Sequence, residues 1–435
     1  MNFNANSTHA AQVASQAMSA HVEQLAREAK TAAQDLAFTS NEERICAVKT
    51  MAQFLRDNAA SIIEANALDM TAAAERGTSA GLLDRLELNE ARIEGMATGL
   101  EELCGLPDSL GRVLEEREIA CGLHMKRVTV PLGLVAVIYE ARPNVTSDAA
   151  GICIRTGNAC ILRGGSLARH SCVAIAHVLS DALEACGIDG KAISIIDAAG
   201  HEATDQLMKL HGIVDVLIPR GGAGLIRHCV ENATVPVIET GTGNCHIYIH
   251  ESANIEQAID IVLNAKTQRT GVCNACESLL LDQSIASAIA PRLIDALTAA
   301  GVTVHAQQDL IAGNTRDLVV AATSEDWGCE YLSMDISLKT VDGVDEAIEH
   351  INRYGTGHSE AIMATDAAAI ERFCNRVDAA AVYANASTRF TDGGQFGLGA
   401  EIGISTQKLH VRGPFAADAL TSYKYIISGE GQVRP

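Results

Sequence analysis

Short apolar runs alternate with helix-like stretches along most of the chain, and this alternation constrains the fold more than any other feature of the sequence. Each run has the length of a strand, and a continuous apolar run suits a strand that is buried on both faces of a parallel sheet. Because strands alternate with helices, right-handed crossovers and a doubly wound α/β arrangement are expected. The runs fall into two series, which predict two α/β domains. The first series comprises 133–139, 159–163, 193–197, 214–219 and 235–239, and the second comprises 246–249, 278–282, 318–322, 336–341, 360–365 and 380–385.

Three other segments complete the expected organisation. Apolar residues at three- and four-residue spacing predict helices between residues 10 and 105. Residues 119–131 alternate like a two-stranded ribbon. The segment 239–245, which contains two glycines, lies between the two series and suits a crossing between domains better than a flexible linker.

Composition excludes some classes of function. The 435 residues are 48% hydrophobic and 20% charged, so the chain can bury large cores, and its length favours about three domains. The 54 acidic residues outnumber the 33 basic ones, and the formal net charge of −21 disfavours binding to nucleic acid or to an anionic membrane surface. An anionic ligand must therefore be met by a local set of donors.

The sequence also favours a cytoplasmic location. No apolar run approaches the roughly 20 residues that span a bilayer, and residues 1–30 lack a basic start followed by an apolar block. The 13 cysteines are scattered through strand- and helix-like segments and are not spaced as a disulfide scaffold. We therefore expect a cytoplasmic protein in a reducing environment, in which most thiols act as small buried side chains.

Cys273 is the most reactive-looking residue of the chain. It follows a Gly turn and precedes a predicted strand, where nearby backbone N–H groups can stabilise a thiolate, and it is therefore the candidate nucleophile. With Cys276 it also forms a C-x-x-C pair, which leaves open a redox dithiol, a zinc site or a purely structural pair. Zinc would need a second pair of cysteines or histidines at ligand spacing, and because the sequence offers none, no metal is expected.

Asn144 belongs to the polar segment 139–146, which comes directly after the apolar run 133–139. Ligands of open α/β sheets gather at the carboxyl ends of the strands, so polar side chains at this position face the expected cleft. An Asn there can donate an N–H to a developing oxyanion. The alternative is an Asn that caps the helix that follows.

Two turns of similar composition follow two further strands, at 163–166 and 220–224. Their glycines allow the backbone to approach a phosphate, a helix N-terminus favours negative charge, and the flanking Arg can add charge-assisted hydrogen bonds. The two turns together suggest a nucleotide. Neither turn has the G-x-G-x-x-G spacing, so an ordinary strand-to-helix turn remains an alternative for each.

Taken in chain order, these motifs resemble the aldehyde dehydrogenase superfamily. The resemblance runs from about residue 20 to residue 432. Three longer segments, 139–150, 268–277 and 341–362, are similar to one branch of that superfamily, whose members reduce L-glutamate 5-phosphate to L-glutamate 5-semialdehyde in proline biosynthesis. The motifs that carry the wider resemblance are Asn144 after Arg142-Pro143, the two turns that begin at Arg163 and Arg220, Glu239 before a pair of glycines, and Cys273.

The resemblance implies a three-part architecture. A Rossmann-like cofactor domain would comprise residues 1–116 and 133–240, and an α/β catalytic domain would comprise residues 241–411. A β-ribbon that joins subunits would comprise residues 117–132 and 412–435. The implied partners are the small-molecule substrate, further copies of the chain, and the glutamate kinase that supplies the substrate.

The resemblance also implies a mechanism that uses NADPH. Cys273 would attack the acyl carbon of L-glutamate 5-phosphate, and the Asn144 side chain with the Cys273 backbone N–H would hold the oxyanion. Glu239 matches the general base of hydrolytic relatives, a role that a phosphate-transferring enzyme does not need. The other implied contacts are those of Arg163, Gly164, Gly165, Arg220, Gly221, Gly222 and Glu330 with the cofactor and those of Arg142, His358 and Ser359 with the substrate.

The implied roles of Arg163 and Glu330 concern two different groups of the cofactor. Many aldehyde dehydrogenases carry Lys at the position of Arg163, and an Arg there is compatible with the 2′-phosphate of NADPH. Glu330 resembles the acidic residue that holds the nicotinamide ribose, with a surface charge as the alternative.

The rival functions are an NAD(P)-dependent hydrolytic aldehyde dehydrogenase, a catalytically silent scaffold, and a metal or redox module at Cys273 and Cys276.

Overall fold

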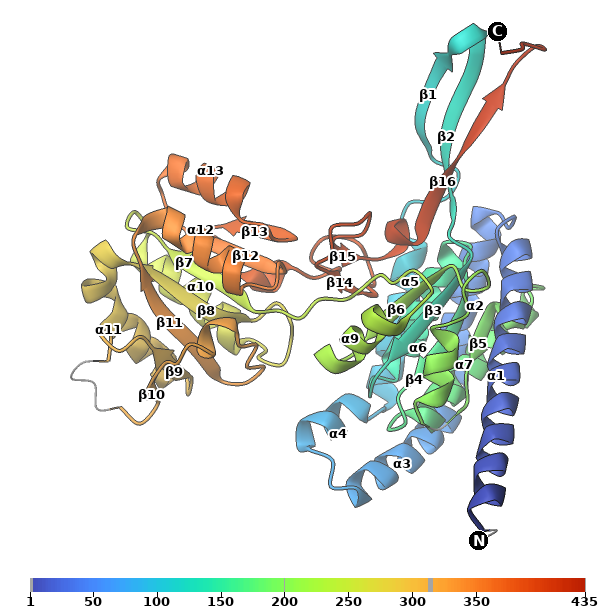
Figure 1. Cartoon of the computed structure of the whole chain (residues 1–435), viewed down its shortest axis with the longest axis horizontal. Helices are drawn as coiled ribbons and strands as arrows, with labels where there is room; N and C mark the ends of the chain where they lie inside the picture. The colour runs from blue at the N-terminus through green and yellow to red at the C-terminus, as the bar shows by residue number, and fades with distance from the viewer. Residues whose placement is uncertain (1–2, 199, 312–315, 435) are drawn as a thin grey trace. The chain divides into compact units, whose positions relative to one another are not determined.

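The structure is a computed structural model that describes residues 3–198, 200–311 and 316–434 (Figure 1). The chain divides into two compact units. The first unit comprises Met1–Thr240, Gly397–Gly403 and Phe415–Pro435, and the second comprises Gly241–Phe396 and Ile404–Pro414. Within the described residues, no helix combines the length and the apolar character that crossing a bilayer requires.

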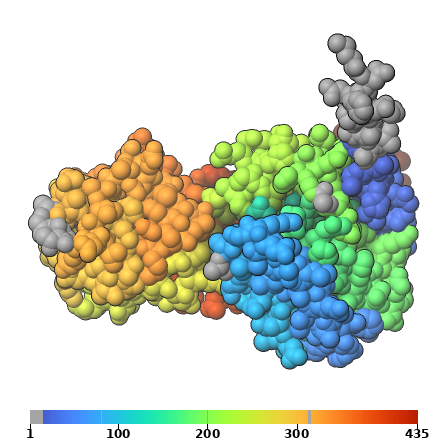
Figure 2. Space-filling model, turned by 90° about the horizontal axis from the view of Figure 1, so that it is seen from below, coloured from blue at the N-terminus to red at the C-terminus, as the bar shows by residue number. Residues whose placement is uncertain are grey.

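Helices form the N-terminal part of the first unit, as the three- and four-residue spacing predicts. The helix α2 shows why the sequence starts a helix where it does, because Ser40 and Glu43 form a capping box at its N-terminus. Its inward side buries Val48, Met51 and Leu55. These helices are α1 (Phe3–Leu36), α2 (Asn41–Asp57), α3 (Ala59–Glu75), α4 (Ala80–Leu86) and α5 (Glu90–Cys104). Residues of α3 and α4, coloured blue, form part of the surface seen in Figure 2.

A four-stranded parallel sheet is the centre of the first unit, with the strand order β5-β4-β3-β6. All six residues of β3 are buried, which explains its continuous apolar sequence. The strands are β3 (Leu134–Tyr139), β4 (Ala159–Gly164), β5 (Ile193–Ile195) and β6 (Val216–Arg220). The helices that follow them are α6 (Asn144–Arg155), α7 (Arg169–Ala185), α8 (Glu202–Leu207) and α9 (Ala223–Asn232), and a 3₁₀ turn, η2 (Gly190–Ala192), precedes β5.

The prediction of a fifth strand in this series, at 235–239, is wrong. Only an isolated bridge between Val237 and Leu217 forms there. Pro236 supplies its carbonyl oxygen to the Leu217 N–H at 2.8 Å but has no N–H of its own, and Ile238 returns an N–H to Leu217 at 2.9 Å. A proline interrupts the ladder of hydrogen bonds, so the segment does not continue as a strand.

The ribbon has three antiparallel strands in the order β1-β2-β16, and these strands lie side by side in Figure 1. It begins at Val113, earlier than the expected residue 117 or 119. The C-terminal strand pairs with β2 from Thr421 opposite Pro131 to Ser428 opposite His124. The elements are β1 (Val113–Ile119), η1 (Ala120–Gly122), β2 (Leu123–Pro131), η5 (Ala417–Leu420) and β16 (Thr421–Ser428).

The second unit contains a seven-stranded sheet with the order β10-β9-β11-β8-β7-β12-β13, and every neighbouring pair is parallel. The two parallel α/β units expected from the sequence are thus confirmed. One strand, β9, was not anticipated. The strands are β7 (Cys245–Ile249), β8 (Cys276–Asp282), β9 (Thr303–Ala306), β10 (Val319–Ala321), β11 (Asp335–Val341), β12 (Ser359–Met363) and β13 (Ala381–Ala384).

Helices cover both faces of this sheet because successive strand residues point to opposite sides. Leu279 and Leu281 of β8 belong to the core beneath α10 and α11, whereas Leu280 belongs to the core beneath α12 and α13. The helices are α10 (Ile255–Thr267), α11 (Gln283–Ala299), α12 (Gly343–Tyr354) and α13 (Ala367–Arg376), with the 3₁₀ turns η3 (Asp326–Gly328) and η4 (Thr388–Phe390). The strands β14 (Gly403–Ser405) and β15 (Gly413–Phe415) form a small separate sheet.

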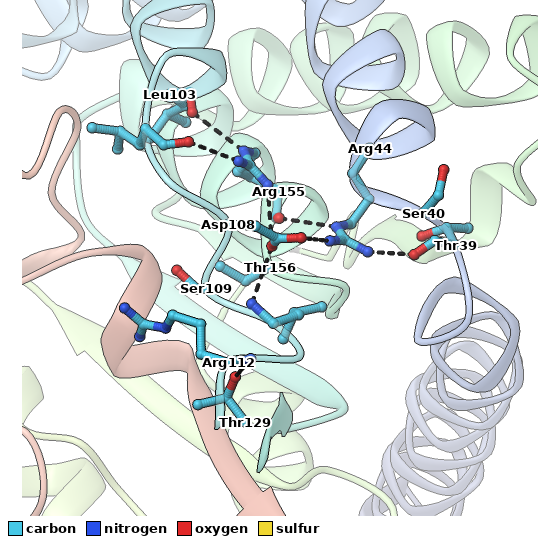
Figure 3. A network of polar contacts seen from close by, with 12 residues as sticks. Thr39, Ser40, Arg44, Leu103, Asp108, Ser109, Arg112, Thr129, Arg155 and Thr156 are labelled. Carbon is cyan, nitrogen blue, oxygen red and sulfur yellow. Dashed lines mark hydrogen bonds and ion pairs between the residues drawn. The ribbon is translucent and has the colours of Figure 1, made fainter. Parts of the chain in front are cut away.

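A buried polar network ties the N-terminal helices to α6 (Figure 3). Arg44 of α2 donates to Asp108 Oδ2 at 2.7 Å and to the carbonyl oxygen of Arg155 at 3.2 Å. Arg155, the last residue of α6, lies 3.5 Å from Asp108 Oδ1 and donates to the Leu106 carbonyl oxygen at 2.9 Å. One carboxylate in the loop after α5 therefore neutralises two buried arginines.

Candidate active site

Cys273, the nucleophile expected from the sequence, is half-buried in the loop 268–275 between α10 and β8, which we call the nucleophile loop. Its backbone is held from two sides. A Cβ on Gly243 would overlap the Cys273 carbonyl group, so only glycine allows this approach of the two chain segments. The Cys245 thiol donates to the same carbonyl oxygen at 3.2 Å. The loop that carries the thiol is thus positioned by the start of β7.

The residue after Cys273 anchors the loop to a distant segment of the chain. Asn274 donates from Nδ2 to the Thr391 carbonyl oxygen at 2.8 Å, and Thr388 Oγ1 donates to the Asn274 carbonyl oxygen at 2.8 Å. Before the nucleophile, Gln268 Oε1 accepts from Arg389 Nε at 2.8 Å. The segment 388–391 therefore holds the nucleophile loop on both sides of Cys273.

Cys276, the other member of the C-x-x-C pair, has a structural position. It is the first residue of β8, fully buried, and donates to the Ser278 carbonyl oxygen at 3.4 Å. Burial raises the pKa of the Cys276 thiol far above its usual range. It therefore stays a neutral thiol that contributes to the core, which argues against a dithiol function for the pair.

Glu330 lies close to the nucleophile loop within the second unit. Its Oε1 accepts the Gly243 N–H at 2.6 Å, so Gly243 contacts both Glu330 and the Cys273 carbonyl. Burial raises the pKa of the Glu330 carboxyl. A fully buried ion pair supports this segment: Glu277 Oε2 lies 2.5 Å from Lys266 Nζ, and Glu277 Oε1 accepts the Leu332 N–H at 3.2 Å.

The structure places His358 and Ser359, the expected substrate contacts, in the interior of the second unit. Both are completely buried. His358 Nδ1 lies 2.8 Å from Ser359 Oγ and 3.8 Å from Cys245 Sγ, and Ser359 donates to Thr391 Oγ1 at 2.7 Å. Burial lowers the pKa of His358 to about 4, so the ring is neutral near pH 7. Both side chains support Cys245 and Thr391, which in turn contact the nucleophile loop.

Asn144 is the first residue of α6 and is exposed at the carboxyl end of β3. The capping alternative is wrong, because Pro143 occupies the N-cap position and no side chain caps the helix. Instead, Asn144 Nδ2 donates to Asp148 Oδ2 at 3.0 Å, one turn along the helix. Burial raises the pKa of Asp148 to about 6, against the opposing effects of Asn144 and of the Arg220 charge. Asp148 thus orients the amide of Asn144.

Apart from Glu330, the expected cofactor residues lie along one edge of the first sheet. Tyr139, at the end of β3, pairs with Gly164 on one side and with Arg220 on the other. β3 lies between β4 and β6, so the chain adds strands first on one side of β3 and then on the other side. Such a switch point is where open α/β sheets bind their ligands.

Arg163 is buried at this edge. Its two terminal nitrogens donate to the carbonyl oxygens of Gly164 and Gly200, and its Nε is buried without a hydrogen-bond partner among the described residues. Burial lowers the pKa of the guanidinium. Gly165 allows a close backbone approach, since a Cβ there would lie 3.2 Å from the Glu140 Cα.

The second glycine turn differs from the expectation of a free phosphate cradle. Glu140 Oε2 accepts the Gly222 N–H at 2.8 Å, so a carboxylate of the chain caps the N-terminus of α9. A Cβ on Gly221 would lie 2.5 Å from the same oxygen, which explains this glycine by packing. Arg142 lies in the turn before α6, and Glu239 is half-buried just before Thr240.

Several functional contacts have no local signal in the sequence. Glu140 and Gly222 are 82 residues apart, and Asn274 and Thr391 are 117 residues apart. Only the fold brings such pairs together. By contrast, the spacing of Asn144 and Asp148 on one helix could have been recognised as an i,i+4 pair.

Comparison with known proteins identifies relatives of this chain in one enzyme family. Residues 3–317 match the model of the aldehyde dehydrogenase family. A gamma-glutamyl phosphate reductase of Moorella thermoacetica is 52% identical over 409 residues, which cover 93% of this chain and 97% of that protein. The crystal structure of gamma-glutamyl phosphate reductase from Thermotoga maritima has a TM-score of 0.93 and 43% identity, over 95% of this chain and 100% of that one.

A solved structure with lower sequence identity shares the fold. An acetylating aldehyde dehydrogenase from Geobacillus thermoglucosidasius has a TM-score of 0.67 and 22% identity, over 97% of this chain and 99% of that chain. This likeness concerns the fold alone. The aldehyde dehydrogenase-like α/β fold expected from the sequence is confirmed by the Thermotoga maritima structure and by the family match. The chain therefore belongs to the aldehyde dehydrogenase family and, within it, to the gamma-glutamyl phosphate reductases.

Proposed function

We infer that the chain catalyses the gamma-glutamyl phosphate reductase step of proline biosynthesis, and we propose that Cys273 is the nucleophile. The substrate is L-glutamate 5-phosphate, and the products are L-glutamate 5-semialdehyde and phosphate. The observation that carries the choice of nucleophile is the arrangement of the loop. Cys273 is half-buried in a segment fixed by Gly243, Cys245 and Asn274, whereas Cys276 is buried in a strand.

In the first step the Cys273 thiolate attacks the acyl carbon of the substrate. A C–S bond forms, and the C–O bond to phosphate breaks, so that phosphate leaves with the bonding electron pair and a thioester remains on Cys273. After reduction of the acyl group, the C–S bond breaks to release the semialdehyde and to restore the thiolate. The fixed loop backbone keeps the sulfur in place through both steps.

The developing oxyanion requires N–H donors. We assign this role to the Asn144 side chain and the Cys273 backbone N–H. Support for Asn144 comes from its exposed position at the end of β3 and from its bond to Asp148, which aligns the amide. Asp148 accepts one N–H of the amide, and the second N–H of the same group can point to the oxyanion.

The residues at the edge of the first sheet fit a dinucleotide. The support is the switch point at β3 and the unpartnered buried Nε of Arg163. Arg163, Gly164 and Gly165 would hold NADPH on one side of β3, with Arg220, Gly221 and Gly222 on the other side, and Glu330 would hold its ribose. When bound, NADPH supplies the hydride that reduces the acyl group. Because Glu140 already accepts the Gly222 N–H, the second turn would contribute through Arg220 more than through its backbone.

Three finer assignments belong to the same proposal. We assign the protein to the cytoplasm, which agrees with the 13 free cysteines. We assign the ribbon of β1, β2 and β16 to contacts between copies of the chain, because Tyr423, Tyr425 and Ile427 of β16 are about half exposed. A functional association with glutamate kinase follows from the chemistry, since an acyl phosphate is easily lost to water.

The test of the nucleophile uses the reverse reaction. Semialdehyde and NADP without phosphate should give about one equivalent of NADPH per site and leave an acyl group on Cys273, which peptide mass spectrometry locates. Added phosphate should then release the acyl group. An acyl group on Cys276, or none on any cysteine, would contradict the assignment.

A further inference from the structure

Two arginines adjoin the nucleophile loop. Arg389 is in η4 and half-buried, and the charges that act on its guanidinium are those of Asp392, Arg269, Cys273 and Cys245. Arg269 itself belongs to the loop, four residues before Cys273. Positive charge at this place contrasts with the whole chain, which has a formal net charge of −21. An acidic protein that binds an anion needs such a local group of cations.

The position of Arg389 is fixed by contacts on both sides of Cys273. Its Nε donates to Gln268 Oε1 at 2.8 Å, before the nucleophile. The carbonyl oxygens of Arg389 and Thr391 accept from Asn274 Nδ2 at 3.4 Å and 2.8 Å, after the nucleophile. The bond to Gln268 uses Nε, and a guanidinium carries four further N–H groups on its two Nη atoms. The side chain is therefore aligned in advance, which reduces the loss of conformational freedom on binding an anion.

We propose that Arg389 binds the phosphate group of the reaction, as the phosphoryl group of the acyl phosphate in reduction and as inorganic phosphate in oxidation. The inference rests on the proposed function, because that function defines phosphate as the leaving group. A guanidinium matches two phosphate oxygens with two parallel N–H groups. Burial lowers the pKa of Arg389 and the Asp392 carboxylate partly offsets this effect, which agrees with a cation that is kept partly dehydrated near Cys273.

The proposal explains how phosphate can take part in both directions at Cys273. In reduction, the C–O bond breaks and its electron pair goes to phosphate, whose growing charge Arg389 stabilises. In oxidation, a phosphate oxygen held by Arg389 attacks the thioester carbon, a C–O bond forms, and the C–S bond breaks to restore the thiolate. Phosphate held next to the thioester competes with water, as a phosphate-transferring enzyme requires.

The first experiment measures steady-state kinetics of semialdehyde oxidation with NADP. Arg389→Ala should raise the KM for phosphate about 10- to 100-fold, the effect of losing charge-assisted hydrogen bonds, with smaller changes in the KM for semialdehyde and for NADP. Arg389→Lys keeps the charge but not the paired geometry and should show a smaller rise. Arg372→Ala is the matched control, because Arg372 is an exposed arginine of the same unit that pairs with Asp345. In the reductive direction, the KM for the acyl phosphate should rise in parallel.

The second experiment needs no turnover. Inorganic phosphate should slow alkylation of Cys273 by iodoacetamide, with the exposed Cys374 as internal reference. Arg389→Ala should need about 10- to 100-fold more phosphate for the same protection. An unchanged phosphate requirement in Arg389→Ala, or in Arg389→Lys if the alanine variant does not fold, would overturn the inference. Rapid oxidation by the unmodified enzyme without phosphate would instead overturn the proposed function.

Discussion

Asp108 is the residue whose loss should weaken the first unit most clearly. Asp108→Ala removes the carboxylate that neutralises Arg44 and Arg155, whose side chains are only 3% and 2% exposed (Figure 3). Removing one partner of a fully buried ion pair costs about 3 to 5 kcal/mol, because the remaining charge is left in a poorly solvating environment.

The magnitude expected here is lower, for two structural reasons. The Asp108 side chain is 27% exposed, so water can replace part of its contribution. Both arginines also keep backbone acceptors, the carbonyl oxygens of Arg155 for Arg44 and of Leu106 for Arg155. We therefore expect a loss of about 2 to 3 kcal/mol in the free energy of unfolding. Asp108→Asn, which keeps an acceptor but not the charge, should lie between the alanine variant and the unmodified protein.

Urea unfolding followed by circular dichroism measures this loss, and a second signal separates the units. Trp327 is the single tryptophan and lies in the second unit, so its fluorescence reports on that unit. Asp345→Ala is the control, because its ion pair with Arg372 is exposed and should contribute little to stability. If Asp108→Ala costs no more than Asp345→Ala, the reasoning about the buried network is wrong.

Three further predictions concern the site and its surroundings. Cys273→Ser should abolish nearly all turnover without changing cofactor affinity, since an alcohol is a far weaker nucleophile than a thiolate, whereas Cys276→Ser should keep most activity; steady-state rates and fluorescence titration distinguish the two outcomes. Asn144→Ala should lower kcat about 10²- to 10³-fold with little change in KM, and a loss of stability at normal kcat would refute its role as an oxyanion donor. His358 and His350 have pKa values lowered by burial to about 4 and about 3, from about 6.5 in an unfolded chain. Because the folded state disfavours their protonation, their contribution to stability is complete above about pH 6.5 and declines as the pH falls toward 4, by up to about 1.4 kcal/mol per pH unit for each ring. His358→Asn should therefore flatten the dependence of the unfolding free energy on pH between 7 and 5, and an unchanged slope would contradict the assignment.

The sequence predicts the strands of this fold well where burial alone determines the pattern. The continuous apolar runs became β3 and β8, which are entirely buried. Prediction failed where one residue type changed the hydrogen bonding, as at Pro236, whose missing N–H ends the pairing of 235–239 with Leu217. It also missed β9, because four residues with the sequence TVHA carry too short a pattern to be recognised.

The site could be predicted in part for a similar reason. The proposed roles of Cys273 and Asn144 follow from local rules about turns and strand ends. The burial of His358 does not, because the sequence shows a His beside a glycine and not the surrounding β7 and β12. Arg389 was missed because it lies 121 residues from Gln268, and only the folded chain brings the guanidinium to the nucleophile loop.

The dependence of semialdehyde oxidation on phosphate tests the central claim most directly. The claim is that a thioester on Cys273 is opened by phosphate and not by water. The assay measures NADPH formation with and without inorganic phosphate, in the unmodified enzyme and in Glu239→Gln, and traps the acyl phosphate with hydroxylamine. We expect steady-state oxidation to require phosphate, to yield trapped acyl phosphate, and to persist largely in Glu239→Gln. Release of free glutamate at full rate without phosphate, together with a loss of about 10²- to 10⁴-fold in Glu239→Gln, would contradict the claim and indicate a hydrolytic enzyme.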